Sequence, residues 1–105
     1  MKPDRPDAFA ATELNELVHG RVRLGILAYL AGAGDADFVS LSHHLKTTNG
    51  NLSVHLGKLE AAGYVALERA IVGKRTRTTV RLTAKGREAL RAYISGMARL
   101  IEQLS

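Results

Sequence analysis

Residues 48–63 have the sequence TNGNLSVHLGKLEAAG. Thr48 is a residue type that caps the start of a helix, and Gly63 is the type that ends one in the left-handed conformation. Together they predict a helix that runs through Ala62. At 100° per residue the leucines of this segment fall within about 60° of one another, and small or polar residues occupy the opposite side. We therefore expect the helix to expose one face and to bury the other, which carries Leu52, Leu56 and Leu59.

Two helical patterns and a short turn lead into this helix. From residue 21 to residue 32, apolar side chains cover more than half of a helix circumference, which predicts a helix covered on two sides. Residues 37–45 have apolar side chains spaced three and four apart, which predicts a compact helix. Lys46 and Thr47 then form the turn. The pattern is therefore two helices, a tight turn and a helix with a polar face.

The amino-terminal residues indicate their secondary structure less clearly than the segments above. Residues 1–11 contain both prolines and several charges, so we interpret them as a loose arm. Thr12 is placed to cap a short first helix over residues 13–18. The apolar side of that helix would be formed by Leu14, Leu17 and Val18.

Residues 64–82 predict a β-hairpin with a positively charged tip. Residues 64–72 are rich in β-branched and aromatic types, residues 73–75 are a turn signal, and residues 76–82 alternate between two faces. The chain has a formal net charge of +5, and most of its acidic residues lie before residue 38. A local excess of positive charge attracts the phosphates of nucleic acids, although a basic surface can also serve only to keep a protein soluble.

The carboxyl-terminal segment predicts an amphipathic helix over residues 83–105, capped by Thr83. Its apolar stripe is wide. Packing within one chain could cover part of the stripe, but its size favours a second copy of the chain as the partner. The predicted dimer interface consists of Leu14, Leu17, Leu90, Tyr93, Ile94, Met97, Leu100, Ile101 and Leu104.

The composition narrows the class of protein. A length of 105 residues suits one domain over residues 1–105, and the absence of cysteine excludes disulfides and thiolate metal sites. No stretch approaches the roughly 20 apolar residues of a membrane span, and the start lacks the apolar core of a signal peptide, so we expect a cytoplasmic chain without membrane contact. The acidic pairs have no nucleophile beside them, so we expect neither enzyme activity nor a cofactor.

The order of elements is that of a helix-turn-helix followed by a wing, in a mainly α, α+β fold with added dimerisation helices at both ends. A helix that enters the major groove of DNA, about 12 Å wide, needs small or hydrogen-bonding side chains near its N-terminus. A basic hairpin beside it can follow the phosphates. The expected DNA contacts are Thr48, Asn49, Gly50, Asn51, Ser53, Val54 and Lys58 from the helix, with Lys74, Arg75 and Arg77 from the hairpin tip.

The segments LSVHL (52–56), LEAAGYV (59–65) and RTTVRLTAKGR (77–87) resemble the small winged-helix transcriptional regulators of the ArsR and MarR type. The similarity is greatest to their stand-alone one-domain branch, which also shares HGRVRL at 19–24. The resemblance implies a homodimer whose two recognition helices enter successive major grooves of a palindromic operator, and it implies repression as the mode of regulation.

The chain departs from these regulators at several positions. Many relatives carry Arg or Lys where this chain has Val54 and Gly57, so base reading by the helix would rest on fewer side chains. Metal-sensing relatives use cysteines near the third helix, and this chain has none. Because the adjacent His43 and His44 diverge by about 100° on a helix, we expect no metal site. We expect His55 to pack its ring and donate one hydrogen bond.

Two other interpretations stay open from the sequence. The same polar helix face and basic hairpin could dock an acidic protein partner in place of DNA. A regulator could also take a small-molecule effector between its dimer helices and its DNA-binding units.

Overall fold

The computed structural model describes residues 15–104, which form four helices and a three-stranded antiparallel sheet. The α+β winged-helix fold predicted from the sequence is therefore confirmed. In chain order the elements are α2 (Arg21–Ala33), β1 (Ala36–Asp37), α3 (Phe38–Leu45), α4 (Asn49–Ala61), β2 (Val65–Val72), β3 (Arg75–Leu82) and α5 (Ala84–Leu104).

The predicted helix over residues 13–18 is wrong in the part that the structure describes. Residues 16–18 form a turn, in which the backbone N–H groups of Val18 and His19 donate to the carbonyl oxygen of Asn15 at 3.1 and 2.8 Å. The Asn15 side chain accepts a further hydrogen bond from the N–H of Leu17 at 2.8 Å. Such local side-chain bonds compete with helix formation. The arm over residues 1–11, the Thr12 cap and Leu14 lie outside the described residues.

Side-chain caps set the starts of three helices. Asp37, Thr48 and Thr83 each accept a hydrogen bond from a backbone N–H in the first turn of α3, α4 and α5, at 2.7, 3.0 and 3.0 Å. Gly63 follows α4 with φ +81°, the left-handed conformation that glycine adopts without strain. The predicted start and end of the polar-faced helix are therefore confirmed.

The sheet has the strand order β1-β3-β2. β2 and β3 pair along their whole length, from Val65 opposite Leu82 to Val72 opposite Arg75. The two residues of β1 pair with β3 near its inner end. The sequence did not predict β1, because two residues are too few to show the alternation that identifies a strand.

The core lies where α2 packs against α3, α4, α5 and β3. The placement of α2 among four elements explains why its apolar residues cover more than one face. The buried members of the core are Val18, Val22, Ile26, Leu27, Leu30, Leu41, Leu52, Leu56, Leu59, Val65, Val80, Leu90 and Tyr93.

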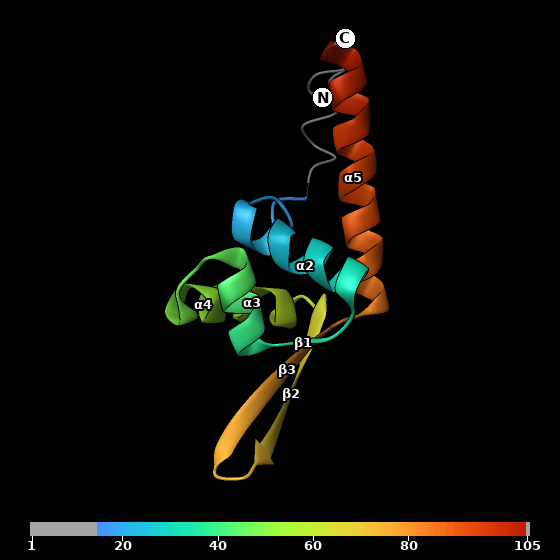
Figure 1. The fold of residues 1–105 in the computed structure, drawn as a ribbon. Helices are drawn as coiled ribbons and strands as arrows, with labels where there is room; N and C mark the ends of the chain where they lie inside the picture. Colours follow the sequence, from blue (N-terminus) through green and yellow to red (C-terminus); the bar gives the residue numbers. More distant parts are fainter. Residues whose placement is uncertain (1–14, 105) are drawn as a thin grey trace.

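The two ends of the structure project from this core in opposite directions (Figure 1). The hairpin of β2 and β3, called the wing below, extends on one side. α5 starts at the base of the wing and continues past α2 on the other side. Among the described residues, no helix combines the length and apolar character needed to cross a membrane.

Candidate nucleic-acid interface

The outer face of α4 is exposed over the whole predicted contact set. Leu52, Leu56 and Leu59 are buried on the inner face, as predicted. Val54 on the outer face leaves 57% of its surface exposed. The other exposed members of the set are Thr48, Asn49, Gly50, Asn51, Ser53 and Lys58. The helix therefore presents a continuous small and polar surface that packing does not use.

Asn51 is held in position at the start of α4. Its backbone N–H donates to the Thr48 hydroxyl at 3.0 Å, and its side-chain Nδ2 donates to the Thr47 hydroxyl at 2.8 Å. Because two threonines restrain the residue, its amide loses less conformational freedom when it meets a ligand. An asparagine in this place is suited to pair with the edge of an adenine.

The wing carries its positive charge at the tip. Gly73 has φ +66° and is the first residue of the two-residue loop between Val72 and Arg75, the position at which a type II′ turn requires glycine. Lys74, Arg75 and Arg77 are all exposed. The tight turn therefore holds cations at the outer end of the wing, which projects away from the helices (Figure 1).

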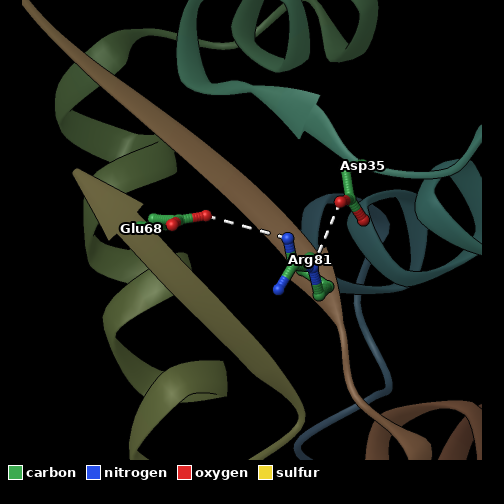
Figure 2. Close-up of polar contacts among 3 residues, drawn as sticks. All are labelled: Asp35, Glu68 and Arg81. Atoms are coloured by element: carbon green, nitrogen blue, oxygen red, sulfur yellow. Dashed lines mark hydrogen bonds and ion pairs between the residues drawn. The ribbon is translucent and has the colours of Figure 1, made fainter. Parts of the chain in front are cut away.

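Arg81 belongs to the same hairpin, but two carboxylates offset its charge. Its Nε lies 3.1 Å from an oxygen of Asp35, and one Nη lies 3.7 Å from an oxygen of Glu68 (Figure 2). The positive field of the wing is therefore concentrated at its tip. The sequence did not reveal this pairing, because Asp35 lies 46 residues before Arg81.

Arg21 and Lys46 place further positive charge beside the start of α4. Both side chains line a shallow hollow next to the turn that precedes α4. The Arg21 guanidinium donates to the carbonyl oxygen of Leu45 at 3.0 Å, which holds it over that turn. The sequence did not single out Arg21 as a DNA contact, because α2 is far from α4 along the chain, and it assigned Lys46 only to the turn.

His55 lies on the side of α4 that faces α2. Burial lowers the pKa of its imidazole, and the charges of Arg23 and Lys58 lower the pKa further. The ring packs as expected, but its Nδ1 has no hydrogen-bond partner, so the expected hydrogen bond is not made by that atom. His19 has a different role, because its Nδ1 lies 2.8 Å from the Tyr93 hydroxyl on α5. Among residues 15–104, no group of three potential metal ligands comes together.

The predicted dimer interface divides into a buried part and an exposed part. Leu90 and Tyr93 are buried in the core of the single chain, and Leu17 packs against that core. Ile94, Ile101 and Leu104 are 55%, 59% and 80% exposed. Met97 and Leu100 are half-buried between them. We call these last five residues the α5 stripe.

The amino-acid sequence of this chain matches a known family and is similar to another protein. A family model described as a winged helix DNA-binding domain matches residues 22–101, a range that spans α4 and the wing. An uncharacterized protein of Methanocaldococcus jannaschii is 37% identical over 83 residues, which are 79% of this chain and 90% of that protein.

Solved structures share the fold. A transcriptional regulator homologue from Pyrococcus horikoshii has a TM-score of 0.84 and 28% identity, over 96% of this chain and 99% of that chain. BpsR of Bordetella bronchiseptica, whose DNA binding is regulated by 6-hydroxynicotinic acid, has a TM-score of 0.71 and 15% identity, over 94% of this chain and 74% of that chain.

Proposed function

The chain belongs to the winged helix DNA-binding domain family, and from this membership we propose that it is a homodimeric transcriptional repressor that occupies an inverted-repeat operator in double-stranded DNA. One observation carries the proposal: the exposed polar face of α4 and the cationic tip of the wing both lie outside the core. A groove-reading helix and a phosphate-binding hairpin need this exposure.

In the proposed complex α4 enters the major groove by its N-terminal half. Asn51 and Ser53 donate to or accept from base edges, and Val54 meets the methyl group of a thymine. Backbone N–H groups at the start of the helix favour a nearby phosphate. Sequence preference would therefore come from a short segment of α4.

The cations around α4 would position the helix. Lys74, Arg75 and Arg77 of the wing contact the phosphates of the adjacent backbone. Arg21 and Lys46, which line one hollow beside the turn before α4, would add further phosphate contacts. Such contacts supply affinity that depends on salt and carries little sequence information.

The α5 stripe is the proposed dimer contact. A contiguous exposed apolar surface on a helix is typical of a protein–protein contact, because covering it removes apolar area from water. A two-fold dimer through α5 would hold two α4 helices so that they reach half-sites about one helical turn apart. Occupation of an operator that overlaps a promoter would exclude RNA polymerase, which is repression.

A small-molecule effector is also proposed. Like BpsR, whose DNA binding responds to 6-hydroxynicotinic acid, this chain would respond to a ligand that binds its DNA-free form more tightly than its DNA-bound form.

Selection from a random pool of duplexes tests the proposed function. The protein is incubated with the pool at moderate salt, and bound duplexes are amplified and sequenced over several rounds. We expect an inverted repeat with half-site centres about 10 base pairs apart. Asn51→Ala should lose this enrichment while retaining weak binding to any duplex. A pool that stays random, together with capture of acidic proteins, would contradict DNA recognition and favour the docking of a protein partner.

A further inference from the structure

A cleft separates the start of α3 from the outer half of the wing. Its volume is about 460 Å³, and its walls come from residues 37–39 on one side and from both wing strands on the other. β1 pairs with β3 only at positions 79 and 80. The edge of β3 beyond these positions is left open, which is why a hollow exists there.

The cleft has an apolar lining that the fold does not use. Val39 and Val72 line it, and they leave 58% and 56% of their surfaces exposed. Phe38 forms part of the same wall and packs against the core. Two exposed valines that face one hollow, with a phenylalanine beside them, form a surface that an apolar molecule can cover.

The charged groups of the cleft favour an anion. Arg75 and Arg77 line it from the wing, and Asp37 lines it from α3. The Asp37 carboxylate already accepts a hydrogen bond from the N–H of Ser40 at 2.7 Å. Two guanidinium groups against one carboxylate leave a positive balance, and guanidinium groups bind carboxylates with charge-assisted hydrogen bonds.

We propose that this cleft binds a small organic anion, with its apolar body against Phe38, Val39 and Val72 and its carboxylate on Arg75 and Arg77. The volume lies within the range of about 300–1,000 Å³ that is usual for small-molecule sites. This cleft is a different place from the one that the sequence left open for an effector, between the dimer helices and the DNA-binding units.

The proposed site has a consequence for DNA binding, and this part rests on the proposed function. Arg75 and Arg77 cannot hold the anion and a DNA phosphate with the same donors at once. A bound anion therefore competes with DNA for the wing and weakens operator binding. The site would thus serve as a regulatory site for the repressor.

Amide chemical shifts of the ¹⁵N-labelled full-length chain map the site, with 2-naphthoate as the probe. We expect the largest shifts at residues 38, 39 and 72–78 and a Kd of about 1 mM, typical of a ligand of this size in an open cleft. The neutral 2-naphthamide should bind at least about threefold more weakly, because it lacks the charge that the arginines bind.

Three variants test which charged residues bind 2-naphthoate. Arg75→Gln should weaken 2-naphthoate binding about three- to tenfold. Asp37→Asn should tighten it, and asparagine caps a helix as well as aspartate does, so the fold is retained. Lys74→Gln is the matched control: it removes a charge from the same wing tip, but Lys74 does not line the cleft, so 2-naphthoate binding should stay unchanged.

The possible outcomes distinguish a failure of the anion site from a failure of the proposed repressor function. Shifts confined to α5, no shifts up to about 10 mM, or equal weakening by Arg75→Gln and Lys74→Gln would each overturn the site. Where the site is right, 2-naphthoate lowers the affinity of the unmodified chain and of Lys74→Gln for the selected duplex. A chain that binds no duplex but shows the mapped shifts would refute the repressor and leave the anion site standing.

Discussion

Gly86 in the first turn of α5 lies directly against the backbone carbonyl group of Tyr64, just before β2. A β-carbon at position 86 would overlap the Tyr64 oxygen and would approach a δ-carbon of Leu82 to 2.8 Å. The backbone N–H of Thr83 also donates to the Tyr64 carbonyl oxygen at 3.1 Å, and the Thr83 hydroxyl donates to the Gly63 carbonyl oxygen at 2.6 Å. The start of α5 is therefore fixed to the base of the wing by backbone contact, so this junction sets the angle between α5 and the wing.

Gly86→Ala should consequently destabilise the protein. The overlap involves backbone atoms, which cannot move aside without shifting α5, so we expect the free energy of unfolding to fall by about 2 kcal/mol or more. Gly57→Ala is the control, because Gly57 is also helical but has open space around it. That substitution should add about 0.5–1 kcal/mol through helix propensity. Urea denaturation of both variants checks the prediction, and equal stabilities would contradict it.

Removal of the wing-tip cations should reduce the salt dependence of DNA binding. With Lys74, Arg75 and Arg77 all changed to alanine, the slope of log affinity against log salt concentration should fall by about two to three units, because each phosphate that the wing neutralises adds about one unit to the slope. Arg91→Ala is a suitable control, because Arg91 lies on α5 and is paired with Glu88 at 3.8 Å. An unchanged slope in the triple variant would remove the wing from the DNA interface.

Asn51→Ala should lower specific binding more than non-specific binding. A base contact by an asparagine contributes discrimination of about 1–3 kcal/mol, whereas the phosphate contacts remain in place. Lys58→Ala should instead reduce the affinity for selected and for unrelated duplexes by a similar factor, because a phosphate contact does not depend on the base sequence. Fluorescence anisotropy with both duplexes measures the ratio. If Asn51→Ala weakens both equally, the residue does not read a base.

Ile94→Asp should convert the proposed dimer to a monomer. Ile94 is 55% exposed in the single chain, so a carboxylate there leaves the core intact but buries a charge in the proposed contact. Ser95→Asp places the same charge on a neighbouring exposed position about 100° around the helix and should leave the dimer unaffected. Light scattering at several protein concentrations gives the oligomeric state. A persistent Ile94→Asp dimer would exclude the α5 stripe as the contact.

His55 should make the folded chain less stable in mild acid. Its pKa in the folded state is below the ordinary value of 6.5, through burial first and then through the charges of Arg23 and Lys58. As the pH falls, the unfolded chain therefore takes up this proton first, so the stability present above pH 6.5 is lost as the pH falls from that value through the folded-state pKa.

The measurement compares the unmodified chain with His55→Gln. Urea denaturation between about pH 7.5 and pH 5.0 should show a larger decrease of unfolding free energy in the unmodified chain, since the other titrating groups are shared. Identical pH profiles would show that His55 does not contribute in this range.

The local features of the DNA-binding unit were readable in the amino-acid sequence. Thr48 and Gly63 mark the ends of α4 because a cap hydrogen bond and a left-handed residue act within a few positions of the chain. The leucine spacing identified its buried face, and Gly73 with its neighbours identified the wing turn. The predicted DNA contacts are accordingly all exposed, and their contact with DNA remains a prediction.

Tertiary packing decided which charges are paired and which apolar residues are buried. Arg81 is in the basic stretch of the sequence, yet Asp35 and Glu68 offset its charge. Tyr93 belongs to the apolar stripe predicted for α5, yet the core of the same chain buries it and His19 bonds its hydroxyl.

The physical reason is the range over which each interaction acts. Caps, turns and periodic faces depend on neighbours within one or two helical turns, so a sequence displays them directly. Charge pairing, the choice between core and partner, and the cleft beside the wing depend on segments up to 74 residues apart. Those segments are brought together in the folded chain, in which α2 packs against β3 and α5.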